Sequence, residues 1–312
     1  MNHISIGINI SKDHLDIHRL PDGASIRLAN SKAGHKALIK WLLADVPERV
    51  VFEPTGAYHR KLERCLAEAG ISYVKVNPRR ARRLAEATGT LAKTDRADAM
   101  MLARLGAVLD PAATTIRSQT LDVLAELVTA RRALVKDRTA ARNRQHNLMS
   151  ALLKAQAELR LKQIDTDLSA IDAECRKLVQ TGEDLKTRFD IIISIKGIGD
   201  VTAMTMLAEM PELGTMDKRQ TASLAGLAPI TRQSGKWRGK SSIQGGRRTL
   251  RQALYMPALV AVRFNLQLKE KYQSMIDAGK PHKIAITAIM RKLITVANAL
   301  IRDQRKWTEI NP

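Results

Sequence analysis

The feature that most constrains the fold is a helix-forming stretch from 121 to 185, which contains a single glycine and no proline. Glycine and proline interrupt helices, so this composition predicts long helices rather than a sheet. Its clearest apolar spacing is four, three, four and three residues, at Ile164, Leu168, Ile171, Cys175 and Leu178. This spacing is as compatible with a helical hairpin within one chain as with a coiled coil between chains. We expect a bend near the polar segment 137–147.

Residues 1–108 show an α/β pattern instead. Isoleucine occupies every second position from Ile4 to Ile10, which predicts a half-buried strand whose exposed face carries Asn9. A tight turn and a second strand follow, to His18. The pattern then predicts helices at 33–46, 58–70, 78–89 and 93–106, with strands at 49–53 and 72–77 between them. This alternation predicts a sheet covered by helices.

The last third is predicted to be mainly helical. Gly197 and Gly199 lie between two apolar helical segments, and 282–303 reads as one amphipathic helix. The turn with the two glycines is typical of a helix-hairpin-helix, whose amides can hold a phosphate, and equally of ordinary helix capping. We therefore expect three parts: an α/β domain at 1–108, a helical coiled-coil connector at 109–190, and a small, mainly α domain at 191–312.

The charge balance indicates the class of partner. The chain has 52 Lys and Arg against 31 Asp and Glu, a formal net charge of +21. Such an excess favours binding to nucleic acid or to an anionic membrane surface. No apolar run approaches the length of a spanning helix, and no signal peptide is evident, which argues against a membrane role. The two cysteines, Cys65 and Cys175, are far apart, so we expect a reduced, cytoplasmic, nucleoid-associated protein.

Four positions in the α/β part invite a metal interpretation. Asn9 lies on the first strand, Glu53 ends the strand 49–53, and Asp95 and Asp98 share one face of a predicted helix. Oxygen ligands of this kind suit Mg²⁺, which can activate and stabilise the oxygens of a phosphoryl displacement. Taken alone, Asp95 and Asp98 also fit a plain helix N-terminus, where acids favour the dipole.

A second constellation lies in the last third, where no Asp or Glu occurs between Asp217 and Glu270. This acid-free span predicts a surface that approaches a phosphate backbone. Ser234 lies within it and is either a nucleophile or merely a turn residue or a phosphate hydrogen-bonder. Ser241 and Ser242 are rival hydroxyls in the same loop. The nucleic-acid-binding candidates over the whole chain are Arg79, Arg80, Arg82, Arg83, Lys196, Lys236, Trp237, Arg238, Lys240, Arg247, Arg248 and Arg251.

Six segments, in order, resemble the transposases of the insertion sequence 110 family, which are relatives of the Piv DNA invertases. They are GINISK, FEPTGAY, KTDRADAMMLA, IKGIGDVTA, LAGLAPITRQSGKWRGK and LRQALYMPAL, and together they span nearly the whole chain. The resemblance implies a RuvC-like (RNase H-like) first domain and a C-terminal transposase domain. It also implies an RNA-guided DNA recombinase that works with a guide (bridge) RNA, with donor and target DNA, and as a homodimer or homotetramer.

The resemblance assigns roles to individual residues. Glu53, Asp95 and Asp98 match three members of an Asp-Glu-Asp-Asp set that binds Mg²⁺, and Ser234 matches a serine that forms a covalent link to DNA. Position 9 departs from the family, because Asn9 stands where the motif has aspartate and so lacks its charge. An engineered change, a tolerated natural variant and a decayed copy all explain Asn9. Two further functions stay open: a RuvC-type structure-selective nuclease and a non-catalytic nucleic-acid-binding protein.

Overall fold

The computed structural model describes residues 4–89, 94–114 and 117–308, and the chain divides into two compact units at 116/117. Lys93, the first residue of the predicted helix 93–106, lies outside the described residues. The three-part division at 108/109 and 190/191 stays a proposal.

The first unit is built on a five-stranded mixed sheet in the order β3-β2-β1-β4-β5. β1 pairs with β2 and β2 with β3 in antiparallel fashion, whereas β1, β4 and β5 run parallel. The strands are β1 (Ser5–Ile10), β2 (His14–Leu20), β3 (Ser25–Ala29), β4 (Arg49–Phe52) and β5 (Tyr73–Lys75). The predicted strands are confirmed, but β3 was missed and β2 is longer than expected.

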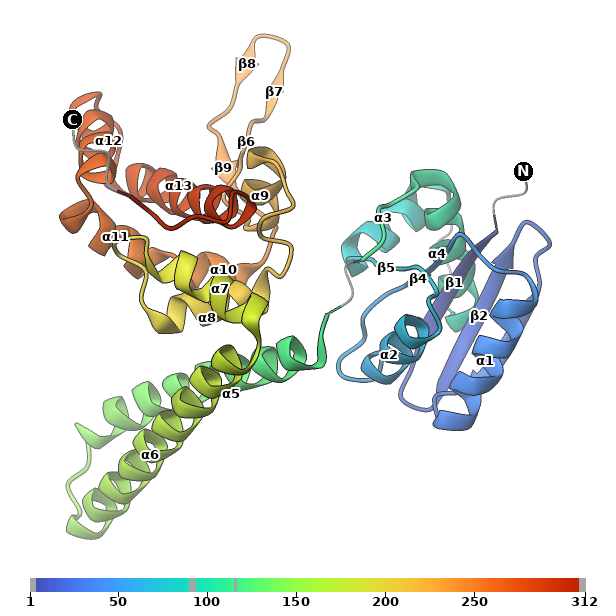
Figure 1. Cartoon of the computed structure of the whole chain (residues 1–312), viewed down its shortest axis with the longest axis horizontal. Coiled ribbons are helices and arrows are strands. Elements are labelled where there is room, and N and C mark those ends of the chain that lie inside the picture. The colour runs from blue at the N-terminus through green and yellow to red at the C-terminus, as the bar shows by residue number, and fades with distance from the viewer. Residues whose placement is uncertain (1–3, 90–93, 115–116, 309–312) are drawn as a thin grey trace. The chain divides into compact units, whose positions relative to one another are not determined.

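Helices cover both faces of this sheet (Figure 1). One core joins the isoleucines of β1 to α1 (Lys32–Ala44) and α2 (Arg60–Glu68). The opposite face packs against α3 (Pro78–Ala87) and α4 (Asp95–Leu109) through a smaller core that includes Val51, Val74 and Leu105. The prediction that β1 is half buried was therefore wrong: Ser5 and Gly7 are small enough for α4 to lie directly on them, so both faces of the strand are covered.

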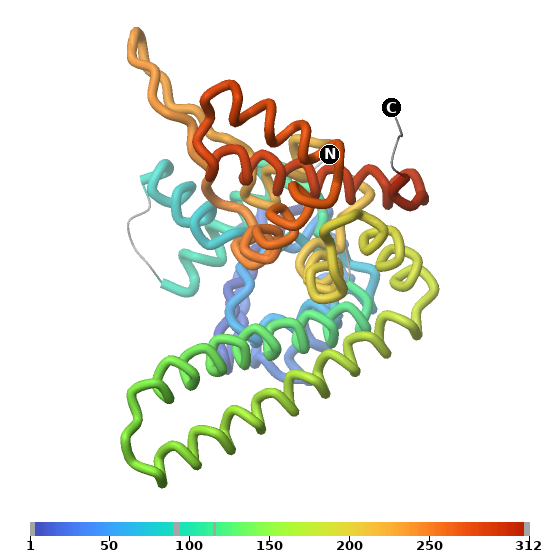
Figure 2. Tube along the Cα trace, turned by 90° about the vertical axis from the view of Figure 1, so that its left-hand side faces the viewer, coloured from blue at the N-terminus to red at the C-terminus, as the bar shows by residue number. Residues whose placement is uncertain are grey.

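The second unit begins with two long helices, α5 (Gln119–Gln145) and α6 (Ala151–Thr181), which pack side by side as a hairpin in both views (Figures 1 and 2). The turn between them follows the polar segment where a bend was expected. Arg131 forms two hydrogen bonds to Asp172 across the hairpin, and Arg138 pairs with Asp165. Leu124 and Val179 join the hairpin to the core of the helices that follow.

The remaining helices of this unit pack around a single core. They are α7 (Glu183–Ile193), α8 (Asp200–Glu209), α9 (Lys218–Leu224), α10 (Arg248–Ala253), α11 (Tyr255–Phe264), α12 (Leu266–Asp277) and α13 (His282–Arg302). α13 is long and apolar enough to cross a membrane by length and composition, contrary to the expectation that no such segment exists. More than half of its most apolar window is buried inside the unit, as in the core helix of a globular domain.

A thin arm leaves this helical unit between α9 and α10 (Figures 1 and 2). Its base pairs β6 (Pro229–Ile230) with β9 (Ser242–Ile243), and its tip pairs β7 (Gln233–Ser234) with β8 (Trp237–Arg238). Nearly all of its residues from 230 to 246 are exposed.

Candidate active site and nucleic-acid interface

The first candidate site is a pocket of about 570 Å³ at the carboxyl ends of the parallel strands β1 and β4. Asn9 lies near the end of β1, Glu53 directly follows β4, and Asp95 and Asp98 occupy the first turn of α4. All four line the pocket. The carboxyl ends of parallel strands are where α/β sheets commonly bind ligands.

Two glycines bring α4 close enough to the sheet to form this pocket. A Cβ atom at Gly7 would overlap the backbone of Ala99 and Ala103 in α4, and one at Gly106 would overlap the Ser5 hydroxyl. That hydroxyl donates a hydrogen bond of 2.8 Å to the carbonyl of Ala103. The contact fixes α4 along β1, and Thr94 caps its first turn by accepting a hydrogen bond from the amide of Ala97.

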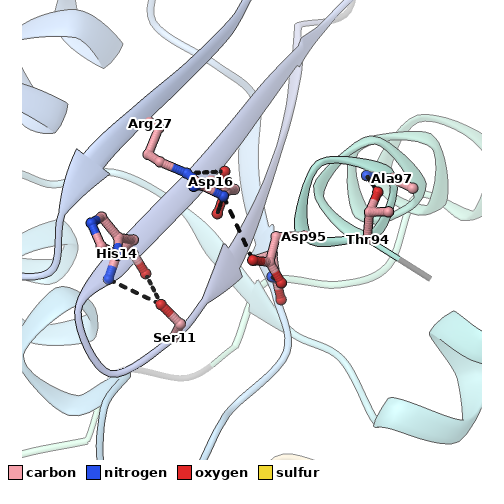
Figure 3. A network of polar contacts seen from close by, with 8 residues as sticks. Ser11, His14, Asp16, Arg27, Thr94, Asp95 and Ala97 are labelled. Carbon is pink, nitrogen blue, oxygen red and sulfur yellow. Dashed lines mark hydrogen bonds and ion pairs between the residues drawn. The ribbon is translucent and has the colours of Figure 1, made fainter.

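Two side chains contact Asp95, and Figure 3 shows the approach of one of them, Arg27. The Asn9 Nδ2 donates a hydrogen bond of 3.0 Å to the Asp95 Oδ1. On the other side, the Arg27 Nη2 lies 3.6 Å from the Asp95 Oδ2. Thus an amide and a guanidinium contact the carboxylate that the sequence assigned to a metal.

The second candidate site is the tip of the arm. Ser234 lies opposite Trp237 across a two-residue turn, in which Gly235 has a φ of +55° that favours glycine. Ser234 is exposed, and no side chain among the described residues hydrogen-bonds its hydroxyl. The Trp237 ring lies over Gly239, where a Cβ would overlap it, and 61% of this tryptophan is exposed.

Comparison with known proteins identifies the family. Residues 6–154 match a DEDD-type transposase model of IS110 elements, and residues 190–273 match the model described as transposase IS116/IS110/IS902 family. The pilin gene-inverting protein of Moraxella lacunata is 30% identical over an alignment 321 residues long, which covers 98% of each chain. The chain belongs to the IS110 family.

Two further relatives agree with this assignment. The pilin gene-inverting protein of Moraxella bovis is 29% identical over 98% of each chain. An IS900 protein of Mycobacterium paratuberculosis is 29% identical over 52% of this chain and 42% of its own length. This IS110-family protein is therefore a DNA transposase or recombinase, and its DEDD domain indicates use of a divalent metal ion.

The acid pocket of this IS110 protein fits such an ion by its chemistry. Three carboxylates and one amide line it, and all can offer oxygen to a hard cation. Their arrangement is not yet a coordination shell: among the described residues, no three His, Cys, Asp or Glu side chains are grouped so that they could hold an ion. Binding would require the carboxylates to draw together and Asn9 to turn its oxygen toward the ion.

Two of the predicted nucleic-acid contacts hold the arm to the body of the protein. Arg247 donates two hydrogen bonds of 2.6 Å to Glu212, and Arg251 donates to the carbonyls of Gly226 and Gly245 at the two roots of the arm. Burial by itself raises the pKa of Glu212, but the hydrogen bonds and charge of Arg247 outweigh it, so the net pKa is lowered. A phosphate contact by either arginine stays a prediction.

The other predicted nucleic-acid contacts are distributed over both units. Arg79, Arg80, Arg82 and Arg83 are exposed on α3, where Arg82 lines the acid pocket and pairs with Glu86. Lys236, Arg238 and Lys240 are exposed on the arm, and Arg248 is exposed at the start of α10.

The turn between α7 and α8 supports the capping interpretation of its glycines. At Gly197, φ is +105° and an added Cβ would press against Pro257 and Ala261 of α11, so this glycine is required by packing. Gly199 instead precedes α8 as its N-cap and has open space around it. Lys196, in the same turn, has a contact within the protein. A phosphate contact at this turn is compatible with these roles and stays a prediction.

A set of cations that was not predicted from the sequence forms what we call the basic cleft. It lies between α9, α12 and α13, and its cations are Lys218, Arg219, Lys271, Arg291 and Lys292. No acid lines it. Partial burial and the charges of Lys271 and Lys218 lower the pKa of Lys292, so these cations repel one another. A neighbouring cleft at the base of the arm shares Arg291 and adds Lys240, Lys280 and Lys283.

Three residues around the acid pocket were not predicted from the sequence either. Lys12 and Tyr58 line it, and Arg27 contacts Asp95 from β3. The available signal was their position beside the strands and turns that carry the acids. Without the strand register, however, that signal does not single them out.

Proposed function

We propose that this IS110-family protein is an RNA-guided DNA recombinase, with a RuvC-like first unit, in which Ser234 attacks the scissile phosphate. The observation that carries the proposal is the convergence of Asn9, Glu53, Asp95 and Asp98 on one pocket. These residues come from three separate segments of the chain, and the strand order around them, with three antiparallel strands followed by two parallel ones, supports an RNase H-like fold.

In the proposed step, the Ser234 oxygen forms a bond to phosphorus and gives up its proton to a base. The bond from phosphorus to one deoxyribose oxygen breaks, and that oxygen takes up a proton. Reversing the step with a different deoxyribose oxygen rejoins DNA and releases the serine. A free serine hydroxyl is a weak nucleophile, and the arm offers it no hydrogen-bonding base among the described residues. We infer that activation comes from outside the arm.

Glu53, Asp95, Asp98 and the oxygen of Asn9 would hold the divalent ion, which we propose to be Mg²⁺. When bound, such an ion supplies positive charge that stabilises the oxygens of a phosphoryl displacement. The family resemblance also implies that the acids and the serine of one site come from different subunits of a dimer or tetramer.

The cations near Ser234 would bind the DNA backbone around the scissile phosphate. Lys236, Arg238 and Lys240 lie on the exposed arm, and each phosphate they neutralise releases counterions. Trp237 offers an exposed ring on which an unpaired base can stack. Guidance by RNA rests on the family resemblance, with which the net charge of +21 agrees.

The helical hairpin of α5 and α6 is the proposed assembly element. Four apolar side chains near its turn are exposed, with Met149 at 93%, Leu152 at 67%, Leu153 at 46% and Leu159 at 69%. Contact between such surfaces of two copies would remove apolar area from water, which favours association.

The test is a denaturing-gel assay for a covalent protein–DNA adduct, with cognate RNA, labelled donor and target DNA, and Mg²⁺. We expect an adduct that Ser234→Ala abolishes and that Ser241→Ala, a matched change on the same loop, leaves intact. Free cut ends without an adduct would instead support a metal-dependent nuclease that uses water. Salt-sensitive binding without any cleavage, even after Asn9→Asp, would support a non-catalytic nucleic-acid-binding protein.

A further inference from the structure

Three side chains form one row across the sheet beside the acid pocket. In the register of β1 and β2, Asn9 lies opposite Asp16, and in the register of β2 and β3, Asp16 lies opposite Arg27. Directly opposite residues of antiparallel strands project from the same face of the sheet. The side chains of Asn9, Asp16 and Arg27 therefore project from one face of the sheet. This is the face that α4, with Asp95 in its first turn, covers.

Asp16 has the features of an anchor for Arg27. Only 8% of Asp16 is exposed, and its two oxygens accept hydrogen bonds of 2.8 and 3.1 Å from the Arg27 Nε and Nη2. This two-point contact matches the planar shape of a guanidinium. Asp16 does not line the acid pocket, and its charge is already balanced.

The contact of Arg27 with Asp95 is looser. The Arg27 Nη2 lies 3.6 Å from the Asp95 Oδ2, beyond hydrogen-bond distance, and 57% of the Arg27 side chain is exposed (Figure 3). Because arginine stays charged at any physiological pH, the acid pocket always has a positive charge at its edge. The Nη2 that faces Asp95 also bonds Asp16, so the exposed guanidinium can turn away from Asp95 without disturbing the core.

We propose that Arg27 is a built-in counter-ion that competes with the divalent ion for Asp95, and that Asp16 holds Arg27 in readiness. The inference rests on the metal ion of the proposed function but assigns a new role to two residues outside the acid set. Two cations near one carboxylate repel each other, so the ion binds Asp95 only as the Arg27 guanidinium turns away from Asp95 while it keeps its contact with Asp16. Asn9 adds to the effect, because its amide also occupies Asp95 and supplies no charge of its own.

The experiment measures binding of Mn²⁺ to the full chain, by the loss of the free-ion electron paramagnetic resonance signal. The variants are Arg27→Gln, Arg27→Lys, Asp16→Asn and the double variant Asp16→Asn/Arg27→Gln. Removal of the charge in Arg27→Gln is expected to tighten Mn²⁺ binding by about three- to tenfold. Arg27→Lys keeps the charge and should bind Mn²⁺ as the parent does. Asp16→Asn releases Arg27 onto Asp95 and should weaken binding.

The double variant separates this proposal from the idea that Asp16 is itself a metal ligand. If Arg27 competes with the ion, Asp16 matters only through Arg27, and the double variant should bind Mn²⁺ as tightly as Arg27→Gln. If Asp16 were a ligand, the double variant would bind more weakly than Arg27→Gln. That outcome would overturn the proposal.

The same set of variants includes a control for loss of folding. Arg27→Gln leaves a nearly buried carboxylate without its cation, whereas the double variant removes both charges together. If Arg27→Gln fails to fold, the double variant is compared with the parent, and it should bind Mn²⁺ more tightly than the parent. Circular dichroism checks the fold of each variant. Equal Mn²⁺ affinity in all folded variants would overturn the role of Arg27 and leave the adduct assay for Ser234 untouched. No Mn²⁺ binding in any variant, Asn9→Asp included, would overturn both this inference and the metal site of the proposed function.

Discussion

The amide nitrogen of Asn9 donates a 3.0 Å hydrogen bond to the carboxylate of Asp95, and so joins the end of β1 to the first turn of α4. An aspartate at position 9 cannot donate this bond when it is ionised. The family resemblance implies aspartate at this position. In this chain, positions 9 and 95 therefore attract each other through a hydrogen bond, where two carboxylates would repel each other.

Asn9→Asp is expected to raise the affinity for a divalent ion and to lower the stability of the metal-free protein. The added carboxylate should tighten Mn²⁺ binding by on the order of tenfold, because affinity rises with the charge of the ligand set. Without metal, the variant should unfold at a lower temperature than the parent, since the hydrogen bond to Asp95 is lost and two acids face each other. Titration with Mn²⁺ and thermal unfolding with and without the ion test both effects.

Asn9→Ala is the control, which loses the hydrogen bond without gaining a charge. An unchanged affinity in Asn9→Asp would mean that position 9 is not a ligand.

Gly7→Ala is expected to separate α4 from the sheet. A Cβ there overlaps the backbone of Ala99 and Ala103, so the helix must shift, at a cost of about 1–3 kcal/mol in the free energy of unfolding. The shift also moves Asp95 and Asp98, so Mn²⁺ affinity should fall. Chemical denaturation and Mn²⁺ titration measure the two effects. Gly199→Ala is the matched control, because Gly199 has open space around it and a negative φ, and should change stability by less than about 0.5 kcal/mol.

The basic cleft is expected to bind nucleic-acid backbone. The double variant Lys271→Gln/Lys292→Gln should weaken binding to duplex DNA of any sequence. The slope of log K against log salt is negative, and it should become shallower by about 0.9 for each phosphate that the protein no longer neutralises. Fluorescence anisotropy at several salt concentrations measures the slope. Lys154→Gln/Lys162→Gln makes the same charge change on α6, away from the cleft. Equal slopes for the two double variants would show that the cleft has no special role.

The first unit is expected to lose stability as the pH falls from 7.5 to 5.5. Burial is the largest cause that lowers the pKa of His18, His35 and His59 below the ordinary value of 6.5. The folded state thus disfavours the charged form, so the stability these groups contribute is complete above about pH 6.5 and falls as the pH drops toward their folded pKa.

Thermal unfolding across that pH range measures the effect. His35→Gln should flatten the pH dependence, because His35 is almost completely buried, at 2% exposure. His146→Gln, at an exposed residue that follows α5 in the second unit, is the control variant. An identical pH profile for parent and His35→Gln would contradict the prediction.

Much of the fold could be predicted because its signals are local. The absence of proline and the near-absence of glycine over 121–185 indicated the helices α5 and α6, and regular apolar spacing indicated α13. β3 was missed because its five residues follow the turn at 21–23 and show only a short alternation. The burial of β1 was predicted wrongly because Gly7 has no apolar side chain, although its lack of a Cβ is what lets α4 cover that face.

The candidate site could be predicted only in part, for the same kind of reason. Glu53, Asp95 and Asp98 belong to recognisable motifs, and the structure brings them to one pocket. Arg27 carries no motif, and its place beside Asp95 depends on the register of β2 and β3, which the sequence alone does not reveal. The basic cleft likewise draws its five cations from three helices that are far apart in the sequence, so no one segment shows the cluster.

The roots of the arm determine how its length can change. The backbones of Gly226 and Gly246 cross so closely that a Cβ on either would overlap the other strand, and Arg251 bonds to a carbonyl at each root. Everything beyond this crossing can lengthen without disturbing the helices beneath. Two residues added to each strand would carry Ser234 about 6.6 Å farther out and keep it on the same face, whereas one residue would turn it to the other. Insertions of two residues in each strand can therefore set the distance between Ser234 and the root of the arm, and they leave Ser234 on the same face.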